Sequence, residues 1–437
     1  MFGSYNVCIP VWVNPPSVNR VLIRIPLPYK IGEATNPGNV DEKLRCEAAT
    51  YIGFVKIAPA YLSRYFTGSP FLMDKLLLQF IEPSSAPLLT RICWRVNHTV
   101  RSWLGLPTSC PYISLRRRGA WRTGYMIIGF VERGRMLSDS WAVMLQDTAR
   151  RQTLFSDLAK IILSLNRVQL PRAGSLTMSN EGVITLTNRP LTLRLQPLEN
   201  EGIATIPRDS TYESVEPYLL DLLQCHDNRI CYQPNAIHDV KDGQEQLAAL
   251  TMMRGLLQQF VSRQHRHGPF FMTLTDLHPS SIFVDDDWHI TSLIDLEWAC
   301  AFPLELQTPH YWLTGRPIDD IEHGEHLQMF EEVVMEYIDA FKRQEMTRGS
   351  PISHAQVLRE CWDRGSFWYF QAVHSPKGLL RVFNEHIQRR FCEEHCTQSI
   401  FDRTVSPYWC VDAKGIIEKK VEEEKDYKNR LKVRFAS

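Results

Sequence analysis

The residues with the clearest chemical potential are two aspartates, Asp276 and Asp295, which stand 19 positions apart. Asp276 lies in a Thr-Asp-Leu-His-Pro-Ser-Ser segment, residues 275–281, and Asp295 lies in an Ile-Asp-Leu-Glu-Trp segment, residues 294–298. Phosphoryl transfer uses two carboxylates in this way, because one orients the attacking hydroxyl and the other holds a metal ion at the phosphates. Asp276 is therefore a candidate catalytic residue and Asp295 a candidate metal ligand.

The chain between the two aspartates has the pattern of a β-hairpin. Residues 282–284 (Ile-Phe-Val) predict one short strand, residues 285–288 (Asp-Asp-Asp-Trp) predict the turn, and residues 290–294 predict the returning strand. A hairpin of this length brings Asp295 back opposite Ser280 and Ser281, and hence close to the loop that carries the first aspartate.

Two segments upstream extend the pattern: Leu-Thr-Asn-Arg-Pro-Leu-Thr-Leu-Arg-Leu at residues 186–195 and Leu-Leu-Asp-Leu-Leu-Gln-Cys-His-Asp-Asn-Arg at residues 219–229. Together with the two aspartate segments, they resemble the catalytic core of the aminoglycoside phosphotransferase family, in particular its fungal branch. Members of this family are kinase-like enzymes that phosphorylate small molecules. The resemblance extends from about residue 3 to about residue 315 and is strongest from residue 124 onward.

The resemblance implies an α+β, bilobal, protein-kinase-like fold. Residues 1–128 would form a small N-terminal lobe around an antiparallel sheet, with an incomplete first strand and a variable insertion at about 58–123 that includes a helix near 86–104. Residues 129–437 would form a larger, mainly helical lobe that holds the catalytic loop 275–281 and Asp295. The charged tail from about residue 419 shows no apolar face, which predicts a frayed helix or disorder.

The same resemblance assigns residues to ATP and Mg²⁺. Ser4 would lie in a turn that covers the nucleotide, and the backbone of Gly129 and Val131 would bind the adenine edge. Arg24, on a strand predicted over residues 20–26, would bind the phosphates. Glu47, on a helix predicted over residues 41–54, would form an ion pair with that arginine.

One position departs from the family pattern. The asparagine that the family carries five positions after the catalytic aspartate, where it holds a second Mg²⁺, is Ser281 here. A serine hydroxyl is a shorter and weaker neutral ligand than an amide oxygen, so Ser281 predicts a weakened second metal site.

Composition narrows the class of protein. The 437 residues are 44% hydrophobic and contain 49 Lys plus Arg against 49 Asp plus Glu. This balance argues against broad nucleic-acid binding, which needs many cationic side chains for phosphates. The sequence shows neither a secretory signal nor an apolar run long enough to span a membrane, which predicts a cytoplasmic protein with no membrane partner. Its 11 cysteines are scattered, as in a reducing compartment, and those at 392 and 396 lack further zinc ligands nearby.

Three functions are compatible with these residues. The first is an ATP-dependent phosphotransferase that acts on a hydroxyl of a small molecule. The second is a pseudokinase with the same fold, which binds a nucleotide or a partner with little turnover. The third is a metal-dependent hydrolase that uses Asp276, His278 and Asp295. The sequence specifies neither the substrate nor the oligomeric state.

Overall fold

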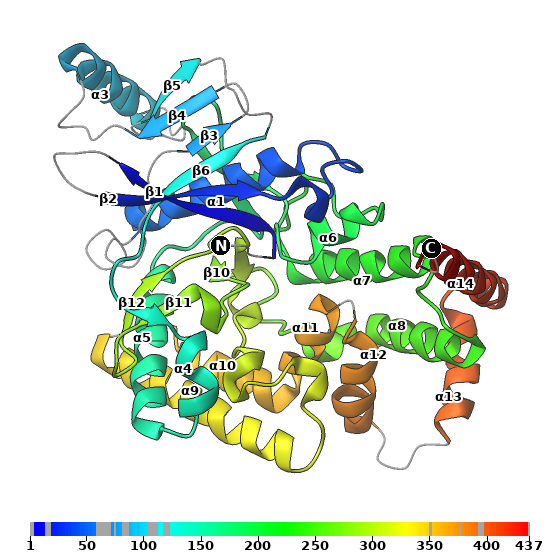
Figure 1. Ribbon diagram of the computed structural model, residues 1–437. Helices are drawn as coiled ribbons and strands as arrows, with labels where there is room; N and C mark the ends of the chain where they lie inside the picture. The colour runs from blue at the N-terminus through cyan, green and yellow to red at the C-terminus, as the bar shows by residue number, and fades with distance from the viewer. Residues whose placement is uncertain are drawn as a thin grey trace. The chain divides into compact units, whose positions relative to one another are not determined.

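An antiparallel sheet of six strands, in the order β1-β2-β6-β3-β4-β5, dominates the N-terminal part of the chain (Figure 1). Its strands are β1 (Asn6–Val13), β2 (Asn19–Pro26), β3 (Phe71–Met73), β4 (Leu76–Phe80), β5 (Tyr112–Arg116) and β6 (Tyr125–Gly129). The computed structural model describes residues 4–13, 19–57, 71–73, 76–80, 87–103, 112–116, 123–348, 352–375, 377–391 and 397–435. The segment predicted as an insertion thus contributes three strands to the sheet and the predicted helix, α3 (Leu88–Trp103).

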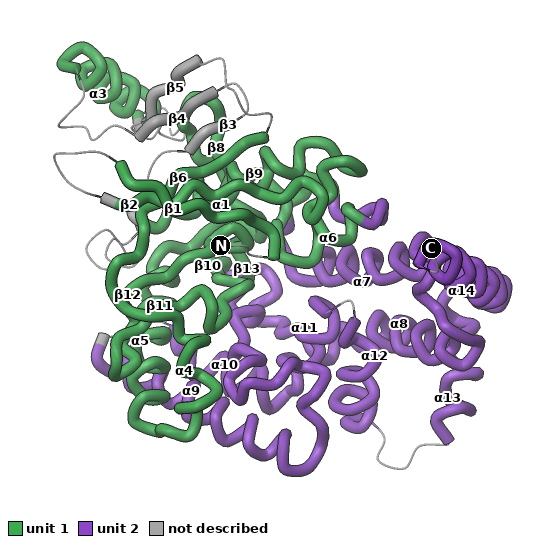
Figure 2. The backbone as a smooth tube through the Cα atoms, viewed as in Figure 1, with its two compact units in different colours: residues 1–200, 207–211, 269–302 green, residues 201–206, 212–268, 303–437 purple. Residues whose placement is uncertain are grey.

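The chain divides into two compact units (Figure 2). Unit 1 comprises residues 1–200, 207–211 and 269–302, and unit 2 comprises residues 201–206, 212–268 and 303–437. Residues from both sides of position 128 contribute to unit 1, so the compact units do not follow the predicted lobe boundary. Both candidate aspartates, the large sheet and the helix after β2 belong to unit 1.

Unit 1 also holds three small sheets and four further α-helices. In these sheets β8 pairs with β9, β10 pairs with β13, and three strands follow the order β12-β11-β7. The pairs β8–β9, β11–β12 and β11–β7 are antiparallel. Their bounds are β7 (Arg135–Met136), β8 (Ser175–Met178), β9 (Ile184–Asn188), β10 (Phe270–Leu274), β11 (Ile282–Val284), β12 (Ile290–Leu293) and β13 (Ala299–Pro303). The helices are α1 (Asn39–Ile57), α4 (Ser138–Met144), α5 (Thr148–Leu165) and α6 (Leu195–Asn200).

Unit 2 is helical in its described residues. Its helices are α7 (Val215–Tyr232), α8 (Val240–Phe260), α9 (Glu325–Arg348), α10 (His354–Arg364), α11 (Ser366–His374), α12 (Leu379–Val382), α13 (Gln398–Val405) and α14 (Ala413–Phe435). The mixed α+β class with small antiparallel sheets is therefore confirmed. None of the described helices has the length and apolar character needed to cross a membrane.

The N-terminus of α1 is fixed by side chains that satisfy its free amides. The Glu33 carboxylate accepts hydrogen bonds from the backbone N–H groups of Gly38 (2.9 Å) and Val40 (2.7 Å). Asp41 and Glu42 occupy the first turn, where negative charge is favourable to the helix dipole. These hydrogen bonds fix the start of the helix that carries Glu47.

A network of buried charges holds the same end of α1. It is formed by Asn188 and Arg189, the Asn-Arg pair of the first upstream segment. The Arg189 guanidinium donates to Glu42 through Nε and Nη2, both at 2.9 Å, and to Glu199 through Nη1 at 2.6 Å. Asn188 donates to Glu42 at 3.0 Å, and Asn39 donates to Glu199 at 2.8 Å. This segment therefore acts as a structural clamp on α1.

The His-Asp-Asn-Arg end of the second upstream segment also has structural partners, within unit 2. His226 contacts a backbone carbonyl of α11 at 2.8 Å, and burial lowers the pKa of its imidazole to about 4. Asp227 forms an ion pair with Arg254 and accepts from the indole N–H of Trp409 at 2.7 Å. These contacts assign the segment to helix packing.

The charged tail from about residue 419 is helical, which is the first of the two alternatives predicted for it. Residues 413–435 form one helix, α14, in which Ala413, Ile417, Lys420 and Glu424 are buried. The stripe escapes a search for apolar residues because two of its members are charged. Long charged side chains can bury their stems when their ends find partners, and here Glu424 pairs with His238 and Lys428, both at 3.0 Å.

The helix predicted over residues 41–54 is confirmed, since α1 covers that segment. Helix α12 is followed by a π-helical turn at Phe383–Ile387, and residues 376 and 392–396 lie outside the described residues. The cysteines at 392 and 396 and the glycine at position 3 also lie outside them.

We expect the Arg189→Met variant to lose on the order of 3–5 kcal/mol in the free energy of unfolding, because it leaves the buried Glu199 without its cation and leaves Glu42 with only the more distant Arg208, at 3.4 Å. Arg359→Met removes an exposed pair with Asp363 on one helix face and should cost less than about 1 kcal/mol. Urea unfolding of both variants measures this difference, and equal losses would contradict the clamp.

Candidate functional site

The hairpin that carries Asp295 is built as the sequence predicts. Strand β11 pairs with β12 in antiparallel register, with Ile282 opposite Leu293, and the turn falls in residues 285–289. The backbone N–H of Ile294 donates to the carbonyl of Ser281 at 3.0 Å. This bond places Asp295 directly beside the end of the loop 275–281.

Two helices of unit 1 fix the hairpin. On α5, the carboxylate of Asp157 accepts from the backbone N–H of Ile290 at 3.2 Å. At the turn, the buried indole of Trp288 donates to the hydroxyl of Ser140 on α4 at 3.1 Å and stacks on Trp141 with ring centroids 5.3 Å apart. The position of Asp295 is thus determined from both ends of the hairpin.

Asp295 has a left-handed backbone conformation, with φ of +65°. Among the described residues other than glycine, only Trp288 shares a positive φ. Such a conformation costs on the order of 1–3 kcal/mol, persists only where the surroundings impose it, and is enriched at functional sites. The strained backbone indicates that the direction of this carboxylate matters.

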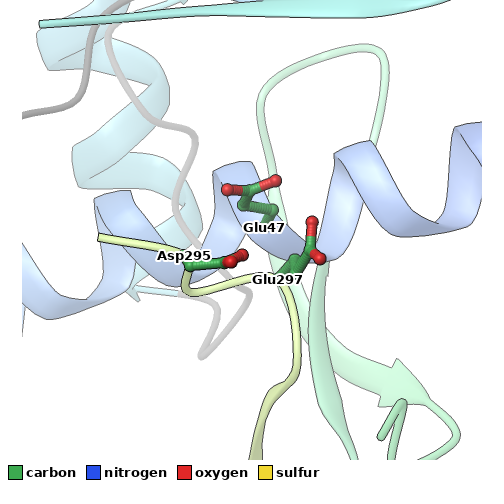
Figure 3. Close-up of side chains that lie close together, drawn as sticks. All are labelled: Glu47, Asp295 and Glu297. Atoms are coloured by element: carbon green, nitrogen blue, oxygen red, sulfur yellow. The ribbon is translucent and has the colours of Figure 1, made fainter. Parts of the chain in front are cut away.

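The guanidinium of Arg24, buried on β2, contacts three carboxylates. Its Nη2 lies 2.5 Å from Asp295 Oδ1 and 2.6 Å from Glu297 Oε2, and its Nη1 lies 3.2 Å from Glu47 Oε1. Figure 3 shows the three acids converging, Glu47 from helix α1 and the other two from the chain after the hairpin. The expected pair between the strand arginine and the helix glutamate is present.

A second buried cation, Lys43, lies one helical turn before Glu47 on α1. Its ammonium forms an ion pair with Glu297 and donates to the side-chain oxygen of Asn6 at 2.7 Å. It also lies 5.5 Å from the ring centroid of Trp298. Asn6 in turn donates to Glu297 at 3.0 Å, so that Glu297 is the best-paired acid of the group.

Three carboxylates therefore share two cations, and the pKa values follow this imbalance. Burial raises the pKa of Glu297, but Lys43 and Arg24 outweigh it and hold that pKa at about 2. Burial raises the pKa of Glu47 to about 7, and Arg24 opposes this only in part. Burial also raises the pKa of Asp295. The site thus has an unmet need for positive charge at Glu47 and Asp295.

A divalent cation fits this need. One carboxylate oxygen from each of Glu47, Asp295 and Glu297 lies within 4.8 Å of the others. Both oxygens of Glu47 are buried and accept no hydrogen bond, whereas the side chain of Asp295 is 37% exposed and reachable from solvent. Hard oxygen ligands of this kind suit Mg²⁺. Asp295, which solvent can reach, would contact an incoming ion first, and Glu47 would supply a second carboxylate.

The hydroxyl of Ser281 is hydrogen-bonded within its own turn, and its predicted role as a metal ligand stays a prediction. Its buried hydroxyl donates to the carbonyl of His278 at 2.8 Å and accepts from the N–H of the same residue at 3.1 Å. The imidazole of His278 contacts the hydroxyl of Ser280 at 3.1 Å. Both side chains are engaged in shaping the turn after Asp276.

Asp276 lies at the start of this turn, and its electrostatic partners are the acids of the cluster. The neighbouring Thr275 hydroxyl donates to the carbonyl of Trp298 at 2.5 Å, which ties the loop to the segment after Asp295. Burial raises the pKa of Asp276 to about 7, with additional repulsion from Asp295 and Glu297. The structure therefore brings the two predicted aspartates into one electrostatic environment.

The remaining predicted nucleotide residues lie at the ends of the large sheet. Ser4 is exposed just before β1, and Gly129 ends β6 opposite Val21 of β2. Val131 follows by two positions and is half-buried. In the described residues, no hydrogen bond or ion pair joins these three to Arg24, and their roles stay predictions.

The sequence analysis did not identify Lys43 or Asn6, and it did not place Glu297 among the site residues. A signal was available for Lys43, because it precedes Glu47 by four positions and therefore shares its helix face. No comparable signal exists for Asn6, whose partner Glu297 is 291 positions away.

A scan of the chain against protein-family models and a search of curated proteins return no match.

We expect Lys43→Met to destabilise the protein by on the order of 3–5 kcal/mol, because it deprives the buried Glu297 of its main cation. The double variant Lys43→Met with Glu297→Leu should recover most of this loss, since the carboxylate that lost its cation is also removed. Lys414→Met, at an exposed ammonium whose partner Glu418 is also exposed, is the control. Strictly additive effects in denaturant unfolding would count against the pairing.

The raised pKa of Asp276 predicts that stability falls as pH rises. The folded state keeps the proton up to about pH 7, whereas an unfolded aspartate loses it near about pH 3.9, so unfolding becomes easier between these values. Asp276→Asn should match the wild type near pH 4 and exceed it at pH 8 by on the order of 2 kcal/mol, allowing for partial exposure.

Urea unfolding in EDTA buffer at both pH values measures this effect. Asp363→Asn, at an exposed carboxylate, is the matched control and should leave the pH profile unchanged. The assignment would be wrong if Asp276→Asn also followed the wild-type profile.

Proposed function

We propose that this chain is an ATP-dependent phosphotransferase acting on a hydroxyl of a small molecule, with the bilobal kinase-like fold of the aminoglycoside phosphotransferase family. The observation that carries this proposal is the contact of Arg24 on a strand with Glu47 on a helix and Asp295 at the end of a hairpin, beside Asp276. These are the parts from which kinase-like enzymes build a phosphate and metal site.

In the proposed reaction, the hydroxyl oxygen of the acceptor forms a bond to the γ-phosphorus of ATP. The bond from that phosphorus to the bridging oxygen breaks, and its electron pair leaves with ADP. Asp276 orients the hydroxyl and accepts its proton, which passes later to solvent. A carboxylate with a pKa near 7 is suited to take up a proton and release it.

The charged residues around Asp276 prepare the site for the phosphates. Mg²⁺ held by Asp295 and Glu47 would supply positive charge to the phosphate oxygens. Arg24 would then need to pair with fewer carboxylates, which frees guanidinium donors for phosphate oxygens. Lys43 and Asn6 hold Glu297 in place throughout, so that the guanidinium keeps one fixed acid partner.

The pseudokinase is the second candidate, and one observation favours it. The hydroxyl of Ser281 is engaged with the backbone of His278, so a second metal would have to do without that ligand. The hydrolase has less support. The imidazole of His278 contacts Ser280, and among the described residues no histidine belongs to the cluster of Glu47, Asp295 and Glu297.

ATP with Mg²⁺ should raise the melting temperature, since a ligand that binds only the folded state stabilises it. Asp295→Asn should remove the part of the shift that requires Mg²⁺. Asp276→Asn should bind ATP nearly as well as the wild type, while ATP turnover falls by about 100-fold or more. Thermal shifts with and without EDTA, followed by an assay of ADP release, measure these effects.

Each outcome selects one function. Nucleotide binding with turnover that depends on Asp276 supports the phosphotransferase. Binding without turnover supports the pseudokinase, and the absence of any shift with ATP would reject the phosphotransferase and the nucleotide-binding pseudokinase. Asp285→Asn, in the exposed turn of the hairpin, is a control for the loss of an acid near the site.

A further inference from the structure

Arg194 stands apart from the other arginines near the site because it has no partner. The side chain is half-buried, and none of the described residues gives it a hydrogen bond or an ion pair. In contrast, Arg24 and Arg189 are each paired with two or more carboxylates. A half-buried guanidinium has lost part of its hydration, and it presents five N–H donors in a rigid plane. Such a group is suited to an anion that arrives from outside.

The fold places Arg194 close to the proposed catalytic aspartate. The preceding Leu193 packs against a core cluster that includes Trp298, and so does Tyr5. The rings of Tyr5 and Trp298 meet edge to face with centroids 5.8 Å apart. The carbonyl of the same tryptophan accepts from Thr275, directly before Asp276. Tyr5 and the residues directly before Arg194 and Asp276 therefore all contact one tryptophan or its core cluster.

Electrostatics agrees with this placement. Burial raises the pKa of Tyr5, and among the charged groups Arg194 opposes this most strongly. Arg194 is also the cation that lowers the pKa of Asp276 against burial and the neighbouring acids. The guanidinium therefore interacts electrostatically with both groups, while none of the described carboxylates forms an ion pair with it.

We propose that Arg194 is a binding residue for an anionic oxygen group, a phosphoryl or carboxylate oxygen, held beside Asp276. This inference rests on the proposed phosphotransferase function. The anion has two possible sources, the γ-phosphate of ATP or an acidic group on the acceptor molecule. In either case Arg194 offsets the negative charge of Asp276 and the cluster, which would otherwise repel the anion.

The test compares Arg194→Ala and Arg194→Lys with the wild type. Arg343→Ala, which removes an exposed arginine in unit 2, is the matched control. Thermal shifts are measured with Mg²⁺-ATP, with Mg²⁺-ADP, and with inorganic phosphate or acetate added to the Mg²⁺-ADP complex. Because Arg194 forms no hydrogen bond or ion pair with the described residues, the melting temperature without ligand should change little, and this measurement shows whether the variants fold.

A loss of about tenfold in ATP affinity, with ADP affinity unchanged, would assign the anion to the γ-phosphate. A loss of the shift with phosphate or acetate, with ATP affinity unchanged, would assign it to the acceptor. In both cases Arg194→Lys should retain part of the binding. Arg194→Ala binding ATP, phosphate and acetate as the wild type does would overturn the inference.

The proposed function can fail separately from this inference. If the wild type binds neither ATP nor ADP, inorganic phosphate titrated onto the free protein still tests Arg194. A phosphate shift that disappears in Arg194→Ala would then support the anion site without the nucleotide, and its absence in the wild type would overturn it.

Discussion

One guanidinium shared among three carboxylates holds the candidate site together. Arg24 reaches Glu47 on α1, and Asp295 and Glu297 after the hairpin, and these groups come from three separate parts of the chain. Each carboxylate would be costly to bury alone, and the attraction to one planar cation offsets much of that cost. Lys43 supplies a second charge but pairs with only one of the three acids. The ion pairs therefore hold the site together, while its three carboxylates still outnumber its two cations.

Helix α1 carries this arrangement because it belongs to two charge networks at once. At its start, Glu42 pairs with Arg189, while Lys43 at the next position and Glu47 one turn further on pair with groups of the site. A shift of the helix along its axis would break both networks together, since neighbouring positions on α1 supply them. The Asn-Arg pair of the first upstream segment thus supports the site through the helix.

Local patterns predicted the hairpin, helix α1 and the helix inside the insertion, because turn residues and apolar spacing act over a few positions. The pairing of Arg24 with Glu47 was predicted from the resemblance to a family. The contacts of Lys43 with Asn6 and Glu297 were not predicted, because a buried polar contact depends on where distant segments meet. The burial of part of the tail was not predicted for a related reason, since α14 buries Lys420 and Glu424, which a search for apolar residues counts as exposed.

The left-handed backbone at Asp295 lowers the stability of the fold but keeps a carboxylate at the site. Glycine is the residue that adopts this conformation without steric cost, and it would relax the backbone while deleting the carboxylate. Selection for stability alone would therefore favour glycine at this position, and an aspartate kept there carries a thermodynamic burden. Natural variation at this single position would show whether a lineage has retained the chemistry or has drifted towards a stable fold that no longer needs it.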